Sequence, residues 1–431
     1  MSKFQIILLA VFILLAVIGV FIFATSSSNQ GAALVPITIW GTLPEADVRQ
    51  AIDDLENANK TTFQASYTYV DEADFQSKLV NAIATGQGPD VVLIPQDIFL
   101  SVKNLLYPIP YASYSQRLFQ DSFAQAGEIF LDPTAGIYAL PVIIDPTVMF
   151  WNRNLLSQAG IALPPKTWTD LLAEVPVLTA KDGNGNLTQS AVSFGEWTNV
   201  PHAKDILSML MLQSGSSIVL ADPTTGKLSA TLLAQSPSGI TPSAEALSFF
   251  TQFADPSKNV YSWNRAMPSA DSAFLAGELA FYFAPASETP TLRARNPNLN
   301  FDVAEVPQTG TTLSGTFANV YAFGLLKSSQ NLNAAVFDMN LLTGDTAAAD
   351  ISAAAAVAPA RRDLLSQTQA SAYQAIFWQS ALIGENFPDP NPSATDNLFE
   401  QMVESVTSGA KGAADSVNTA NASLGALLQT Q

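Results

Sequence analysis

Two polar side chains follow an apolar run of the sequence, where they could hydrogen-bond a polar ligand. Gln96 and Asp97 follow Val91–Ile94 after one residue, Pro95, and this run is typical of a strand that is buried on both faces. In open α/β sheets, ligands bind beyond the carboxyl ends of the strands. A carboxylate accepts hydrogen bonds, and an amide both donates and accepts them. The alternative is that Asp97 caps a helix over residues 98–104.

Further polar candidates lie near the end of the first expected strand. Leu34–Trp40 is rich in β-branched residues and is predicted to be a strand. Trp40 and Thr42 lie at its carboxyl end, where they would form a second edge of the same site. Glu45 follows as another candidate, although it could instead be a charge in the first turn of the next helix.

Asp145 is a polar candidate because it stands in the apolar segment Gly136–Phe150. A carboxylate in such surroundings must be paired or must face a cavity. Pro141 and Pro146 make this segment a poor strand interior, so we expect an extended crossing between two lobes. Asn319 is placed with these residues as a candidate on a strand that faces the cleft.

The composition excludes several kinds of chemistry. The net charge of −18 disfavours nucleic acid, because phosphate neutralisation needs clustered Lys and Arg. The chain has no cysteine, which excludes thiolate catalysis, disulfides and cysteine-ligated metals, and its one histidine, His202, cannot form a histidine pair. We therefore expect no metal and no cofactor. Only 13% of the residues are charged, which favours a neutral ligand.

The order of the elements indicates an α/β fold. Strand-like and helix-like patterns alternate over residues 34–97 as β-α-β-α-β, which predicts a parallel, doubly wound sheet. A chain of 431 residues is long for one domain and suits two.

The N-terminus carries an apolar run that is long enough to cross a bilayer. Phe4–Ala24 contains one polar residue, Gln5, and a helix of this length spans about 30 Å. The polar stretch Thr25–Ala33 is typical of a tether. An uncleaved membrane anchor is the expectation, while a cleaved signal peptide ending at Ala24 is the alternative. In both cases the body of the protein is exported.

Several segments together resemble one known family. They are Gly88–Val92, Leu140–Asp145, Phe150–Leu156, Ala159–Trp168, Ala273–Phe281 and Pro297–Pro307. In this order the chain resembles the extracellular solute-binding proteins of bacterial ABC transporters, in the sugar-binding, maltose-binding-protein-like branch. Thr167, at the end of one of these segments, is predicted to cap a helix that starts at Trp168.

The resemblance implies a fold and a division of the chain. The fold would be the two-lobe type II fold of periplasmic binding proteins, with hinged, doubly wound lobes, preceded by the transmembrane helix. Residues 1–33 would be anchor and tether. The first lobe would comprise residues 34–144 and 308–358, and the second lobe residues 145–307 and 359–431.

The same resemblance implies a function and adds aromatic site residues. A non-catalytic receptor, held at the cell membrane with its body outside the cytoplasm, would bind a sugar or oligosaccharide between its lobes and deliver it to an ABC transporter permease. We expect it to be a monomer. Sugar rings stack on planar aromatic side chains. The aromatic candidates are Trp197, Trp263, Tyr282 and Phe399, each of which could instead belong to the core.

Two other classes of function stay open. A carbohydrate-active hydrolase or lyase would need two carboxylates roughly 5–10 Å apart across a cleft, which Asp97, Asp145 and Glu45 could supply. No nucleophile elbow and no HExxH motif is present in the sequence. The other class is a surface adhesion protein that keeps the two-lobe fold without transport.

Overall fold

The computed structural model of the chain describes residues 34–310, 314–369 and 371–429. The predicted membrane anchor at Phe4–Ala24 lies outside these ranges. Within them, no helix combines the length and the apolar character that a membrane span requires.

The first half of the molecule is built on three parallel strands in the order β2-β1-β3. Its elements begin with β1 Ile37–Gly41, α2 Glu45–Ala58, β2 Ala65–Tyr69, α3 Glu72–Ala84, β3 Val91–Pro95 and α4 Gln96–Val102. Helix α2 buries Val48 and Ile52, and α3 buries Phe75 and Leu79. The predicted alternation of strand and helix is confirmed, because each helix turns one apolar stripe toward the core.

Later segments of the chain complete this half. They are η1 Lys103–Leu105, α5 Gln116–Ser122, η2 Gln125–Phe130, β4 Leu131–Asp132, β5 Gly136–Ile137, α12 Leu332–Leu342, α13 Asp345–Ala354, β14 Ala358–Pro359 and α14 Arg362–Leu365. Helix α13 packs against α2.

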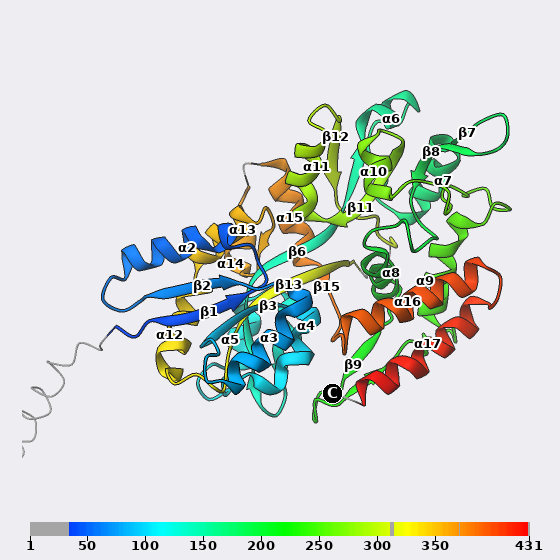
Figure 1. Cartoon of the computed structure of the whole chain (residues 1–431). Coiled ribbons are helices and arrows are strands. Elements are labelled where there is room, and N and C mark those ends of the chain that lie inside the picture. Colours follow the sequence, from blue (N-terminus) through cyan, green and yellow to red (C-terminus); the bar gives the residue numbers. More distant parts are fainter. Residues whose placement is uncertain (1–33, 311–313, 370, 430–431) are drawn as a thin grey trace, which may run out of the picture.

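Two long strands cross the middle of the molecule. Strand β13 Thr316–Leu325 runs antiparallel to β3 and to β6 Ala139–Asn152. The far end of β6 pairs with β11 Leu279–Pro285 and β12 Phe301–Ala304, which belong to the second half. The expected crossing is therefore confirmed (Figure 1).

The expectation that prolines keep this segment out of a sheet interior was wrong. All 14 residues of β6 are buried, and Pro141 and Pro146 pair with Ala322 and Ala318 of β13. Proline cannot donate a ladder hydrogen bond, but a bulge relieves that loss. The register shifts between Tyr321 and Ala322, directly opposite Pro141.

The second half combines short strands with the remaining helices. Its elements are α6 Arg153–Gln158, α7 Trp168–Leu178, β7 Ala180–Lys181, β8 Leu187–Val192, α8 Ala203–Gln213, β9 Val219–Ala221, β10 Leu228–Ala230, α9 Pro242–Thr251, η3 Gln252–Ala254, α10 Ala270–Leu275, β11, η4 Ala286–Glu288, α11 Thr289–Arg295, β12, α16 Pro392–Thr407 and α17 Ala413–Leu428. Helix α15 Ala372–Leu382 and strand β15 Gly384–Glu385 lead into it. Thr167 and Asp170 form a reciprocal capping box at the start of α7, so the predicted helix cap is confirmed.

Two separate hydrophobic cores divide the described residues. The first core gathers β1, β3, the first part of β6 and most of β13. It also takes Ala360, Leu364 and Ala381. The second core gathers the end of β6, β11 and helices α8, α9, α16 and α17. Two cores joined by crossing strands form the two-lobe α/β fold that the sequence predicts, with the cores side by side in Figure 1.

Candidate functional site

A cleft of about 610 Å³ lies between the two cores, close to the carboxyl end of β3. The first core supplies Glu72, Pro95, Asp97, Asn319 and Tyr321 to its wall, and the second core supplies Trp197, Val200, His202, Ala203, Lys204, Asp205, Pro392, Ser393, Asp396 and Asn397. A concave site in which polar groups of two lobes converge is the usual form of a small-molecule site.

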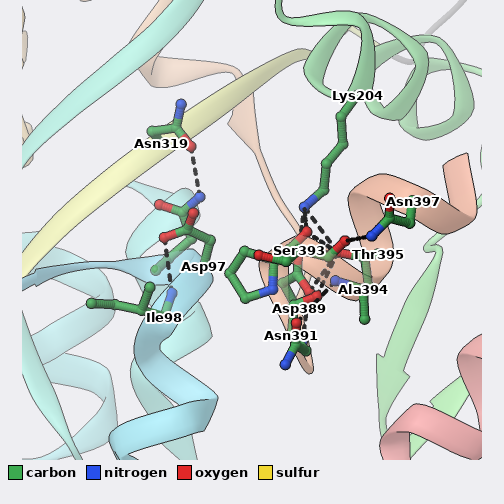
Figure 2. A network of polar contacts seen from close by, with 12 residues as sticks. Asp97, Ile98, Lys204, Asn319, Asp389, Asn391, Ser393, Ala394, Thr395 and Asn397 are labelled. Carbon is green, nitrogen blue, oxygen red and sulfur yellow. Dashed lines mark hydrogen bonds and ion pairs between the residues drawn. The ribbon is translucent and has the colours of Figure 1, made fainter. Parts of the chain in front are cut away.

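Asp97 lies at the start of α4 and lines the cleft. Its Oδ1 accepts a hydrogen bond from the backbone N–H of Ile98 at 2.8 Å (Figure 2). Burial, the largest cause, and the charges of Glu72 and Asp389 together raise the pKa of Asp97 to about 7, while Lys204 opposes them. The structure places Asp97 on the cleft wall and inside the first turn of α4, whose N-cap residue is Pro95, so the alternative that Asp97 caps this helix was wrong.

Gln96 holds Asn319 in place. The Gln96 side chain is buried, its Nε2 donates to Asn319 Oδ1 at 2.8 Å, and its Oε1 accepts from the backbone N–H of Val320 at 2.5 Å. Asn319 itself lines the cleft. Gln96 therefore orients a cleft residue from behind, and the structure does not place Gln96 on the cleft wall.

Lys204 forms the centre of the opposite wall, at the start of α8. Its Nζ donates to Asp389 Oδ2 at 2.5 Å, to Thr395 Oγ1 at 2.9 Å and to the backbone carbonyl of Pro392 at 3.3 Å. Figure 2 shows this side chain reaching from α8 to the segment before α16, opposite Asp97 and Asn319. The Asp389 side chain is only 3% exposed, so this ion pair is largely removed from water.

His202 precedes α8 and carries a second ion-pair network. Its backbone has a φ of 61°, and its Nε2 lies 2.7 Å from Glu288 Oε1. Its Nδ1 lies 3.8 Å from Asp205 Oδ2. Burial alone would lower the pKa of His202, but its bonds to Asp205 and Glu288 raise the pKa to about 10. The imidazole is therefore charged at neutral pH.

Trp197 supplies the aromatic surface of the cleft. It is partly buried and lines the cleft, and its side chain hydrogen-bonds Asp396. Gly195, two residues earlier, has a φ of 99°, and a Cβ there would lie 2.7 Å from the backbone nitrogen of Ala254. Only glycine fits this approach, so Gly195 fixes the path of the loop that presents Trp197.

Three aromatic candidates do not reach the cleft in this structure. The side chains of Trp263, Tyr282 and Phe399 are fully buried in the second core. Phe399 stacks on Phe387, and the Tyr282 hydroxyl donates to Glu288 at 3.0 Å. Their rings are covered by neighbouring side chains. The prediction that they offer a stacking face was therefore wrong, and the alternative that they belong to the core holds.

Asp145 is paired rather than exposed to the cleft. Its side chain is buried in β6, and its Oδ1 accepts from the backbone N–H of Ser287 at 3.1 Å. Burial raises the pKa of Asp145 to about 6, although its bonds to Ser287 and the charge of His202 counteract this. Asp145 thus joins the crossing strand to the turn that bears Glu288.

The candidates near the first strand also lie outside the cleft wall. Trp40 packs against the first core and is partly buried. Thr42 is partly buried, and its backbone N–H donates to Leu93 O at 3.2 Å. Glu45 is exposed at the start of α2 and forms an ion pair with Arg49 one turn later, as the alternative of a first-turn charge predicted.

Several cleft residues were not identified from the sequence. Glu72, Lys204, Asp205, Tyr321 and Asp396 all line the cleft. The first three lie in the opening turns of α3 and α8, and helix starts that face a predicted cleft could have singled them out. Within the described ranges, no group of three or more His, Asp or Glu side chains is placed to hold a metal ion.

Two other hollows of the surface are larger, and the larger of them also joins polar groups of both halves, with Lys103 and Tyr138 on one side and Ser229 and Asn421 on the other. One of about 950 Å³ lies between α4 and the hairpin β9–β10 with α17, and one of about 730 Å³ lies beside α9 and the end of α16. The 610 Å³ cleft adjoins the carboxyl end of β3, where the fold is expected to bind ligand.

Comparison with known proteins agrees with this geometry. A binding protein of Brucella abortus (strain 2308) is 24% identical over 261 residues, which cover 59% of this chain and 58% of that protein. A cyclic alpha-maltosyl-1,6-maltose binding protein from Arthrobacter globiformis superposes with a TM-score of 0.74 at 16% identity, over 93% of this chain and 100% of that one. A cyclo/maltodextrin-binding protein solved with maltotetraose has a TM-score of 0.73 at 16% identity, over 94% and 100%. These structures show the shared fold.

The family profile covers most of the chain. The profile of bacterial extracellular solute-binding proteins matches residues 50–377. This range takes in both walls of the cleft except the residues of α16. The chain therefore belongs to the bacterial extracellular solute-binding protein family.

Proposed function

We propose that the protein is a receptor that binds a sugar or oligosaccharide in the cleft between its two cores. Proteins of this family bind solutes and are not enzymes. The structural relatives named above bind maltodextrins or a cyclic maltosyl sugar, and a related receptor of Streptomyces glaucescens was solved with acarbose, with a TM-score of 0.69. These likenesses support a saccharide, and the side chains of the cleft fit one.

One observation carries the proposal. Hydrogen-bonding groups of the first core, on Asp97 and Asn319, face a wall of the second core that contains the indole of Trp197. A saccharide needs both kinds of contact, because its hydroxyl groups require donors and acceptors and its ring face packs on an aromatic surface.

The two cores would act as lobes that close on the solute. We propose that the lobes comprise residues 34–144 and 308–358, and residues 145–307 and 359–431, with β6 and the segment before β13 as connectors. Closure by hinge bending would bury the solute and create the form that a permease prefers. The anchor at Phe4–Ala24 would hold the body of a monomeric receptor outside the cytoplasm and next to its ABC permease.

A screen of saccharides by thermal unfolding tests the proposal. A saccharide at about 100 times its Kd stabilises the folded state by about 2.7 kcal/mol, which raises Tm by roughly 3–6 °C. Trp197→Ala should abolish most of this shift, while Trp378→Ala, a ring that is not on the cleft wall, should preserve it. If peptides or metal ions stabilise the protein and no saccharide does, the proposed function is wrong.

A further inference from the structure

The cleft is lined by more acidic than basic side chains. Four carboxylates line it, namely Glu72, Asp97, Asp205 and Asp396, against two cationic side chains, His202 and Lys204. A carboxylate can accept hydrogen bonds from sugar hydroxyls, so acidic residues alone do not identify a cationic solute. What matters is whether the protein's own cations neutralise these acids.

Both cations of the cleft are already paired within the second core. Lys204 Nζ lies 2.5 Å from Asp389, whose side chain lies behind the cleft wall and is almost fully buried. His202 is shared between Glu288, at 2.7 Å, and Asp205, at 3.8 Å. Asp389 and Glu288 do not line the cleft. Lys204 therefore neutralises a carboxylate outside the cleft wall, and His202 is shared between such a carboxylate and Asp205.

The carboxylates of the first core have no ion-pair partner of this kind among the described residues, although the charge of Lys204 acts on both Asp97 and Glu72. Among the described residues, the hydrogen bond that Asp97 accepts comes from the backbone N–H of Ile98 and uses only Oδ1, and Glu72 has no ion pair within 4.0 Å. Asp97 is partly buried at the start of α4 and Glu72 is exposed, and the charge of Glu72 acts on Asp97. Across the cleft, Asp396 hydrogen-bonds the indole of Trp197.

We propose that the solute is an amino sugar, or an oligosaccharide that contains one, whose protonated amine lies between Asp97 and Glu72 on the first wall. The inference rests on the proposed function and specifies its substrate class. A neutral solute was expected from the low charged fraction of the chain, and the arrangement of the cleft reverses that expectation. The sequence could not show it, because Lys204 meets Asp389 across 185 positions of the chain.

Physical chemistry supports a cation at this position. Two carboxylates that share a partly desolvated site raise each other's free energy unless one takes up a proton or a cation approaches. An ammonium group about 4 Å from Asp97 would interact with it far more strongly than a hydroxyl does. The half-buried indole of Trp197 offers the same cation the face of an aromatic ring.

Matched pairs of sugars test this inference. Each pair differs only in an amine that replaces a hydroxyl: D-glucosamine and D-glucose, D-galactosamine and D-galactose, and the chitosan disaccharide and cellobiose. Calorimetry at pH 6.5 in low salt gives Kd for each sugar. We expect at least one amine to bind 10-fold or more tightly than its neutral partner, with a preference that weakens at 0.5 M NaCl.

Variants locate the effect. Asp97→Asn and Glu72→Gln should each weaken binding of the amino sugar about 10-fold more than binding of its neutral partner. Asp74→Asn is the matched control, since Asp74 lies on α3 with Glu72 but pairs with the exposed Lys78 and does not line the cleft. It should change neither affinity.

The outcomes separate the two proposals. If a neutral sugar binds as tightly as its amine partner or more tightly, the amino-sugar inference is wrong and the saccharide receptor stands. The same holds if Asp97→Asn and Glu72→Gln leave the preference unchanged. If no member of any pair binds and no saccharide stabilises the protein, both proposals fail.

Discussion

Lys204 is the residue whose loss should damage the cleft most. Replacing it with Met leaves the Asp389 carboxylate buried without its cation, although Thr395 Oγ1 and the backbone N–H of Asn391 still donate to it. We expect Lys204→Met to lower the free energy of unfolding by about 2–4 kcal/mol in urea titrations. The double variant Lys204→Met/Asp389→Asn should recover at least half of this loss.

A surface lysine provides the comparison. Lys78 pairs with Asp74 at 3.0 Å, but both side chains are more than half exposed. Lys78→Met should change the free energy of unfolding by less than about 0.5 kcal/mol. Equal effects of the Lys78 and Lys204 variants would show that Asp389 does not depend on Lys204.

The raised pKa of Asp97 should make the stability of the protein depend on pH. Its pKa of about 7 in the folded protein lies above the ordinary value of 3.8, so the folded state holds the proton more tightly than the unfolded state. The stabilisation that comes from this tighter proton binding is present below pH 4 and is lost as the pH rises to about 7. Glu72 and Asp389 favour the protonated form, and Lys204 opposes it.

The Asp97→Asn variant isolates this contribution. Relative to the unsubstituted protein, the variant's free energy of unfolding should increase by about 1–2 kcal/mol from pH 4 to pH 8. This figure is smaller than the full pKa difference implies, because water at the cleft screens the charge. Urea titrations of both proteins at the two pH values measure the difference, because other titrating carboxyls such as Asp145 contribute equally to both. A difference that stays constant with pH would contradict the raised pKa.

At the residue scale, the sequence located part of the cleft. Asp97 and Asn319 were predicted from their positions after a strand and on a strand, Trp197 was one of the aromatic candidates for stacking on a sugar, and all three line the cleft. Whether they bind the solute stays a prediction. The sequence could not distinguish the buried rings of Trp263 and Phe399 from the ring of Trp197, because the exposure of a ring depends on distant residues that cover it.

At the scale of elements, Gly195 controls the loop that presents Trp197. Gly195→Ala would place a methyl group 2.7 Å from the Ala254 nitrogen at a φ of 99°, which forces the loop to move. We expect a loss of about 2–4 kcal/mol in the free energy of unfolding and a lower affinity for any cleft ligand.

A second glycine serves as the control for Gly195. Gly183 lies in an exposed turn, and no heavy atom would come within 4 Å of an added Cβ. Gly183→Ala should therefore change the free energy of unfolding by less than about 0.5 kcal/mol and leave ligand binding intact. If both variants behave alike, the close approach at Gly195 does not position Trp197.

The elements themselves were more predictable than the site. Helix α7 begins at Trp168, where the sequence predicts, because the Thr167 cap is a local signal. The prediction that β6 is a poor sheet interior was wrong, since its partner β13 comes from far along the chain and the register shift at Val142 accommodates Pro141.

At the scale of the whole molecule, two cores and a pair of connecting strands were predictable from the order of the elements and from the family resemblance. The charge balance of the cleft was not, because the pairs Lys204–Asp389 and His202–Glu288 each join segments that are distant in sequence. The fold brings helix starts of both halves to one cleft, and this arrangement is what the proposed closure on a solute requires.

A crystal structure of the protein with its tightest-binding saccharide tests this account most directly. The account predicts that the saccharide lies between the two cores, hydrogen-bonded to Asp97 and Asn319 and packed against Trp197. A saccharide bound in the hollow beside α9 and α16, or in contact with one core alone, would contradict it.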